Sequence, residues 1–154
     1  MYLTMSLKQF NEEFIILSDK IKNNIMNNSD FYRIYYSSPD ITFNGIFLDF
    51  ELNDIIIEQY FNKIKCCFTI NEHNKKIIER ILDIEKSILK NSNIFNKTPI
   101  YRIEEQLHNN FIKIFDDKCT KIGNYKNKKF FLKISGIWAN SSNEYGLTFR
   151  FFIY

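Results

Sequence analysis

The chain has 154 residues, of which 45% are hydrophobic and 25% are charged, and its formal net charge is +3 at pH 7. This composition is that of one ordinary globular domain and excludes disorder over most of the chain. No apolar run approaches the roughly 20 residues that a membrane-spanning helix needs, and the first residues lack the pattern of a signal peptide. We therefore expect an intracellular, non-secreted protein without a membrane partner.

The cysteines agree with a reducing compartment. Their number is odd, and two of them, Cys66 and Cys67, are adjacent, while Cys119 stands alone. A disulfide framework is therefore not expected.

The distribution of charge is more informative than the lysine content. Val is absent and Ile and Asn are abundant, as an A/T-rich coding sequence produces, so lysines by themselves indicate little. Residues 118–154, however, hold seven Lys or Arg and one acid, Glu144, whereas residues 1–117 hold 14 Lys or Arg and 17 acids. This asymmetry favours a polyanionic partner, and a solvated lysine loop explains it equally well.

The first half of the chain reads mainly as strands. Residues 7–26 fit either a helix or a strand followed by a helical turn. The run "FYRIYY" at 31–36 predicts a strand that ends before the turn residue Pro39. The run "ITFNGIFLDFEL" continues with strand-forming residues, and Asn44-Gly45 marks a hairpin turn or a bulge. "IKCCFTI" at 64–70 predicts another strand.

The second half begins with the one clear helical pattern. Between Asn74 and Lys90, isoleucines recur at helical spacing, and charged residues occupy the opposite face. Four strand-like runs follow, at 100–107, 110–115, 129–138 and 145–153. The order predicts a β-rich α+β domain, compatible with a small barrel of the oligonucleotide-binding (OB-fold) type with one prominent helix. One domain spans residues 1–154, with the place of residues 1–30 left open.

Signals for catalysis or metal binding are poor. His73 and His108 lie far from each other and from the cysteines, so no zinc pattern exists. The acidic pairs, such as Glu104-Glu105 and Asp116-Asp117, are sequence neighbours, whose side chains point to opposite faces of a strand. We expect no catalytic residue, no metal and no cofactor, and hence a protein that is not an enzyme.

Aromatic residues beside cations suggest binding instead. Arg33, Lys133 and Arg150 each have an aromatic residue two positions away, which alternation places on the same strand face. Aromatic rings stack on unpaired bases, and cations neutralise phosphates. The candidate nucleic-acid-binding residues are Phe31, Arg33, Tyr35, Lys126, Lys128, Lys129, Phe131, Lys133, Trp138, Arg150 and Phe152.

The sequence leaves open whether these aromatics are accessible or buried. Both sheet faces could be buried, one by closure of the sheet and the other by the helix. Trp138 shares its alternation with Leu132 and Ile134, which places it inward, yet it ends its strand. It is therefore either a core residue or a contact at the rim of the binding face.

Two segments resemble a known family. "RIYYSSPDITFNGIFL" at 33–48 and "FLKISGIWANSSNEYGLTFRF" at 131–151 are similar to the first strand and the closing hairpin of single-stranded DNA-binding proteins of large nucleocytoplasmic DNA viruses. These are similar in turn to the replicative single-stranded DNA-binding protein of short-tailed phages. The matched positions are Trp138, Gly146, Phe149 and Arg150 in the hairpin and Tyr35, Tyr36 and Pro39 in the first strand and turn.

The resemblance implies an OB-fold barrel without enzymatic activity that coats unpaired strands during viral replication, recombination or repair. It implies single-stranded nucleic acid as partner, DNA rather than RNA, together with replication proteins, in the host cytoplasm or nucleus. Phage members end in an acidic tail, whereas no acid follows Glu144 here, so recruitment through such a tail is not expected. The alternative is a viral structural or protein-interaction module of the same β-rich fold, with a homodimer as one form.

Overall fold

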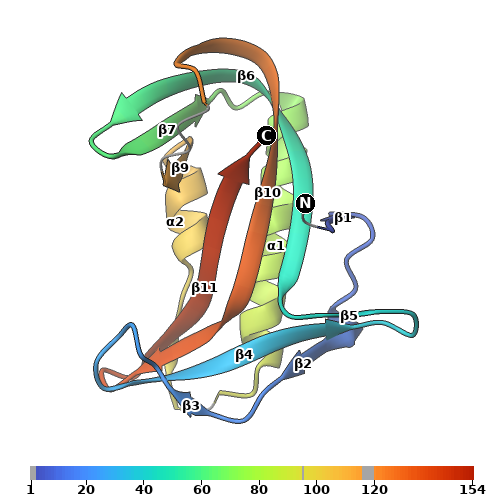
Figure 1. Ribbon diagram of the computed structural model, residues 1–154, viewed down its shortest axis with the longest axis vertical. Coiled ribbons are helices and arrows are strands. Elements are labelled where there is room, and N and C mark those ends of the chain that lie inside the picture. The colour runs from blue at the N-terminus through green and yellow to red at the C-terminus, as the bar shows by residue number, and fades with distance from the viewer. Residues whose placement is uncertain (1–2, 95, 116–119) are drawn as a thin grey trace.

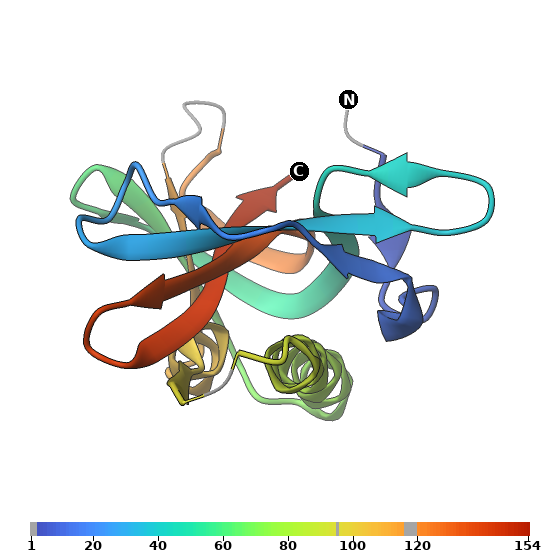
Figure 2. The same cartoon turned by 90° about the horizontal axis from the view of Figure 1, so that it is seen from below.

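The computed structural model describes residues 3–94, 96–115 and 120–154. Its strands form an open, mostly antiparallel sheet, and two helices lie on one side of it (Figures 1 and 2). The strands are β1 (Met5–Ser6), β2 (Ile15–Leu17), β3 (Ile21–Lys22), β4 (Ser29–Ser37), β5 (Thr42–Phe43), β6 (Ile46–Tyr60), β7 (Lys63–Phe68), β8 (Thr98–Ile100), β9 (Phe111–Phe115), β10 (Gly123–Asn140) and β11 (Glu144–Ile153). The helices are α1 (Glu72–Asn91) and α2 (Arg102–His108), and a 3-10 turn, η1, covers Glu12–Phe14. The predicted β-rich α+β class is confirmed.

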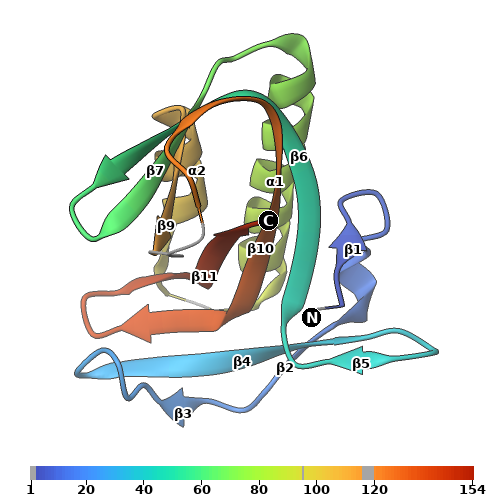
Figure 3. The ribbon, with the colours of Figure 1, turned by 45° about the horizontal axis from the view of Figure 1, so that its top comes forward.

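Strand β10 is the centre of the sheet, whose main order is β2-β4-β10-β6-β7-β9. One edge of β10 pairs first with β6, from Gly123 to Ile134, and then with β4, from Gly136 to Asn140. Its other edge pairs with β11. Figure 3 shows β6 and β10 arching together toward β7 and β9. Segments from both ends of the chain therefore meet on one strand.

The hydrophobic core lies between the sheet and α1. Ile81, Ile84 and Ile88 of the helix are buried there, as the sequence predicts. The helix begins at Glu72 because the Asn71 side chain caps it, accepting a hydrogen bond from the backbone N–H of Asn74 at 2.8 Å. The sheet contributes alternate residues of β6, β7, β9, β10 and β11 to the same core.

Two expectations about local structure are corrected. The run at 100–107 was expected as a strand, but only its first residue ends β8, and Arg102–His108 is helical. Ile103 and Leu107, four residues apart, bury one face of this short helix. The described part of residues 1–30 holds no α-helix: its strands β1, β2 and β3 pair with β6 and β4, so this part belongs to the same sheet.

The sheet is open in the part of the chain that the structure describes, because no ladder of backbone hydrogen bonds joins β9 to β11. These pairings therefore do not establish a closed OB-fold barrel. They establish a curved, β-rich sheet with two helices. Neither helix combines the length and the apolar character that crossing a bilayer would require, as judged over the described residues.

Candidate functional site

The face of the sheet that points away from the helices carries cations and aromatic rings from six strands. We call it the outer face, and Figure 1 looks onto it, with α1 behind β6 and β10. Strand register and burial place its basic and aromatic residues. They are Phe31 and Arg33 on β4, Phe47 and Tyr60 on β6, Lys63 and Lys65 on β7, Phe111, Lys113 and Phe115 on β9, Lys129, Phe131, Lys133 and Trp138 on β10, and Arg150 and Phe152 on β11.

The predicted cation and aromatic pairs lie on this face. Lys133 and Arg150 are direct partners across the β10–β11 ladder, and Phe131 and Phe152 are direct partners two positions along. The two rings stack with centroids 4.4 Å apart and planes 7° apart. Phe131 is only 5% exposed as a result, so its expected role as an accessible stacking surface is corrected.

Trp138 also lies on the outer face, which corrects its predicted alternation. The β10–β11 register shifts between Ile134 and Gly136, so Ser135 forms a bulge and the side chains after it change faces. Ile137 and Ala139 therefore enter the core in place of Trp138. The indole is 3% exposed: it packs against Gly146 on one side, and the guanidinium of Arg102 lies 4.7 Å from the ring centroid.

The basic segment at 126–129 does not form one patch. Lys128 pairs with the core residue Leu52 in register, stands on the helix side of the sheet and lies 4.2 Å over the ring of Tyr125. Lys129 points to the outer face opposite Glu51, and Lys126 is exposed beside them. The sequence predicted that these lysines bind together, but strand alternation places Lys128 and Lys129 on opposite sides of the sheet.

Tyr35 lies apart from the other predicted residues. Tyr35 is on the same side of β4 as Arg33 but pairs with Ile16 of β2, beyond the β10 ladder. Lys118, which the sequence grouped with the basic segment, lies outside the described residues, as do Cys119 and the acidic pair at 116–117.

Sequence reasoning missed a second cluster on the outer face, where β6, β7 and β9 meet. We call it the β7–β9 patch; it consists of Tyr60, Phe61, Lys63, Lys65, Phe111, Lys113 and Phe115. The amino groups of Lys65 and Lys113 lie 4.7 and 5.2 Å from the centroid of the Phe111 ring. Lys63 lies 4.3 Å over Phe115, and the guanidinium of Arg150 lies 5.0 Å from the same ring. The patch therefore continues into the predicted face.

The cations of the outer face repel one another. Lys65 is the direct cross-strand partner of Lys113, as Lys133 is of Arg150, and like charges in such positions destabilise a sheet. None of these four forms an ion pair with an acid among the described residues. The acids of the face, Asp49, Glu51 and Glu58, lie along β6, and Glu58 is the direct partner of Lys65 on the side away from Lys113. The side toward β9 and β11 is therefore predominantly positive.

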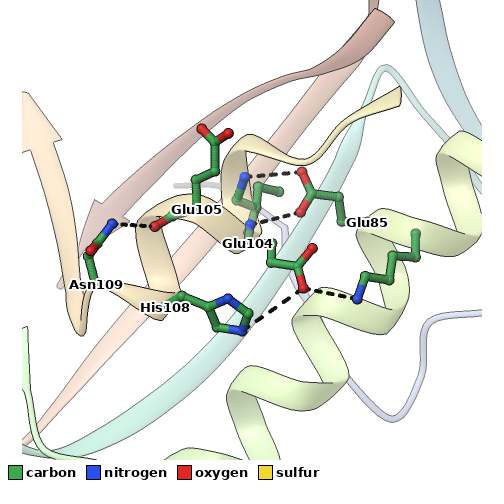
Figure 4. Close-up of polar contacts among 7 residues, drawn as sticks. Glu85, Glu104, Glu105, His108 and Asn109 are labelled. Atoms are coloured by element: carbon green, nitrogen blue, oxygen red, sulfur yellow. Dashed lines mark hydrogen bonds and ion pairs between the residues drawn. The ribbon is translucent and has the colours of Figure 1, made fainter. Parts of the chain in front are cut away.

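The short helix α2 owes its position, and that of Arg102, to a buried carboxylate on α1. Glu85 accepts hydrogen bonds from the backbone N–H groups of Ile103 and Glu104 at 3.0 and 2.9 Å (Figure 4). Burial raises the pKa of Glu85 to about 7, although these two hydrogen bonds act in the opposite direction. The Glu104 carboxylate also accepts from Lys86 Nζ at 3.0 Å.

The cysteines and histidines of the described part of the chain have the following surroundings. Burial raises the pKa of the Cys66 thiol to about 12, and partial burial raises that of Cys67, so both thiols hold their protons at neutral pH. His73 lies against the carbonyl oxygen of Glu51, and His108 is 4.0 Å from Glu104. Within 3–94, 96–115 and 120–154, no three His, Cys, Asp or Glu residues gather in a way that could hold a metal ion.

A pocket of about 690 Å³ opens beside Trp138, between β10 and the segment at 21–26. We call it the Trp138 pocket. It brings together three of the predicted residues, Phe31, Arg33 and Trp138, with Arg102 of α2. The cations Lys133 and Arg150 lie farther along the same face, toward the β7–β9 patch.

Comparisons of the chain with models of protein families, with curated proteins and with solved structures find no match.

Proposed function

We propose that the protein binds single-stranded nucleic acid, DNA in the first place, along the outer face. The observation that carries the proposal is the placement of cations opposite cations, over aromatic rings, at Lys65–Lys113 and Lys133–Arg150. Such an arrangement costs stability in the free protein, and a bound polyanion offsets that cost. The role is that of a non-enzymatic protein that coats unpaired strands, as the resemblance to viral single-stranded DNA-binding proteins implies.

The accessible rings favour unpaired strands over duplex. Phe115 is 52% exposed, Tyr60 is 40% exposed and Phe61 is 85% exposed, all within the β7–β9 patch. A base stacked on such a ring contributes about 1–3 kcal/mol, and only unpaired bases expose their faces. The cations beside the rings attract phosphates without reading sequence.

The first prediction concerns the salt dependence of binding. Fluorescence anisotropy with a labelled oligonucleotide of about 15 thymidines should show an affinity that falls steeply with salt, and weaker binding to duplex of equal length. The double variant Lys65→Gln with Lys113→Gln should lower the slope of log K against log salt by about 1.4, because each phosphate contact on a single strand contributes about 0.7.

The matched control removes two cations from the opposite side of the molecule. Lys75→Gln with Lys76→Gln changes two exposed lysines on α1, whose ion pairs with Glu79 and Glu72 are long, at 3.9 Å. Its affinity and slope should equal those of the unmodified protein. Binding that is absent, insensitive to salt or equally reduced in both double variants would overturn the proposal.

A protein interface is the second candidate, favoured by the exposure of Phe61 at the tip of the β6–β7 hairpin. An apolar ring in water beside Tyr60, with centroids 5.0 Å apart, suits a partner protein or a second copy of the chain. Sedimentation at rising protein concentration, compared between the unmodified protein and Phe61→Ser, separates self-association from nucleic-acid binding.

A further inference from the structure

The Trp138 pocket has the size and lining of a small-molecule site. Its volume of about 690 Å³ falls within the range of ligand pockets, which are mostly apolar with a few converging polar groups. Its apolar wall includes Ile21, Ile25 and Met26, and Ile25 is 90% exposed to water. The opposite wall consists of the aromatic residues Phe31, Trp138 and Phe149.

The charge of the pocket is entirely positive. Lys22, Arg33 and Arg102 line it, and no Asp or Glu does. Arg33 donates to the side-chain oxygen of Asn44 at 3.3 Å, and Arg102 lies over Trp138, but none of the three cations has an ion pair with a described acid. Asp30, the cross-strand partner of Lys22, pairs with Lys20 instead, at 3.7 Å.

Two glycines hold the aromatic wall in place. A Cβ atom on Gly136 would lie 2.4 Å from the Phe31 ring, and one on Gly146 would lie 2.8 Å from the Trp138 ring. Each ring therefore packs directly against the backbone of a neighbouring strand. The aromatic wall has its shape before any ligand arrives, which reduces the entropy cost of binding.

We propose that the Trp138 pocket binds a nucleoside monophosphate, presented as the phosphorylated end of a nucleic-acid strand. The base would lie against Phe31 and the apolar wall, and the phosphate would be held by Arg33 and Arg102, while Lys22, paired in register with Asp30, adds positive charge at the edge. Two guanidinium groups without an acidic partner exceed the single charge of an internal phosphodiester, whereas a terminal phosphate carries about −1.5 to −2 at pH 7. The inference deepens the proposed function, since the strand would continue from this pocket along the outer face.

The second prediction follows the emission of Trp138, the only tryptophan of the chain. Oligonucleotides of one sequence with a 5′-phosphate, a 3′-phosphate or neither are titrated, alongside thymidine monophosphate, thymidine and inorganic phosphate. A phosphate on one end should raise affinity about tenfold or more, equivalent to about 1.4 kcal/mol. Thymidine monophosphate should change the emission, whereas thymidine and inorganic phosphate should do so only at far higher concentration.

Two variants test whether the preference for a phosphorylated end arises in the Trp138 pocket. Arg102→Gln, at an exposed position on α2, should abolish the preference for a phosphorylated end and leave most of the affinity for an unphosphorylated strand. Lys65→Gln with Lys113→Gln, in the β7–β9 patch, should lower affinity for all strands and keep the preference. Thermal unfolding confirms that each variant is folded.

The outcomes separate this inference from the proposed function. Strand binding that ignores terminal phosphate, or a preference that survives in Arg102→Gln, overturns the pocket assignment and leaves strand binding standing. A response to thymidine monophosphate that requires Arg102, without strand binding, supports a free nucleotide as ligand and overturns the strand proposal. An equal response to inorganic phosphate alone overturns the nucleotide part of the inference.

Discussion

Burial in the folded protein favours the protonated form of the Glu85 carboxyl group. It is 0% exposed, and burial raises its pKa from an ordinary value near 4.5 to about 7. Between these two values the unfolded chain releases a proton that the folded protein retains. The stabilising contribution is therefore complete below about pH 4.5 and is lost as the pH rises to about 7.

The third prediction is a difference between two pH profiles. In denaturant unfolding from pH 5 to 8, the contribution of Glu85 should fall with rising pH, by roughly 3 kcal/mol at most from the linkage of 1.36 kcal/mol per pKa unit. Glu85→Gln, which cannot ionise, should lack this component. Profiles that run parallel for the two proteins would show that Glu85 is ionised in both states.

The sequence predicted individual outer-face residues where alternation within one strand was sufficient. Arg33 and Arg150 lie on the expected side because each is flanked by core residues. Lys65 and Lys113 show the same local alternation, in "KIKCCF" and "FIKIF", and that signal could have placed them. Their proximity could not be predicted, because it depends on the pairing of β7 with β9 across an intervening helix pair.

At the scale of elements, Asn74 joins the start of α1 to β6. Its side-chain oxygen accepts from the backbone N–H of Asn53, and its amide group donates to the carbonyl oxygens of Asn53 and Thr69, each at 2.8 Å. Asn53 precedes Asp54, whose φ of 55° interrupts the strand. One fully buried side chain thus satisfies the backbone where β6 is irregular.

The fourth prediction is that Asn74→Ala destabilises the protein by about 2–4 kcal/mol, because several buried backbone groups lose their partners. Urea unfolding measures the loss. The comparison variant Asn109→Ala removes a single exposed hydrogen bond, to the carbonyl oxygen of Glu105 at 2.7 Å, and should cost less than about 0.5 kcal/mol. Equal losses in the two variants would contradict the role assigned to Asn74.

The elements that sequence reasoning missed depend on distant partners. Helix α2 has seven residues and no side-chain cap of its own, since Tyr101 at its N-cap makes no such hydrogen bond. The N–H groups at its start donate to the carboxylate of Glu85, which lies on α1, and no local sequence pattern reveals this contact. The bulge at Ser135 is likewise set by pairing with β11, which is why alternation along β10 alone could not decide the face of Trp138.

At the scale of the molecule, the class of fold was predictable and its closure was not. Alternating strands and one strong helical pattern were sufficient for a β-rich α+β domain. Whether strands meet at the ends of a sheet depends on twist and register, which residue types specify weakly. The sheet proves to be open between β9 and β11 in the described part of the chain.

The fifth prediction concerns the stability of the whole protein with and without an oligonucleotide. A ligand at about one hundred times its Kd adds about 2.7 kcal/mol, which should raise Tm by roughly 5–10 °C for a domain of this size. In low salt without ligand, Lys113→Gln should be at least as stable as the unmodified protein, because it removes the like-charge pair with Lys65 and leaves Lys65 opposite Glu58. Differential scanning calorimetry measures both effects, and a clear loss of stability in the variant would contradict them.

The length of β10 has a consequence for the order in which the protein opens. From Gly136 to Ala139 the strand lies between β11 and β4, so its amide groups point alternately to one neighbour and the other, and each exchanges with solvent when its own ladder opens. Strand β3 is short, pairing with β4 through Ile21 and Lys22 and a hydrogen bond from the N–H of Asn23 to the carbonyl oxygen of Ser29, and we expect it to open by local fraying. We therefore expect slow amide exchange on the β10 side of the Trp138 pocket and faster exchange on its β3 side.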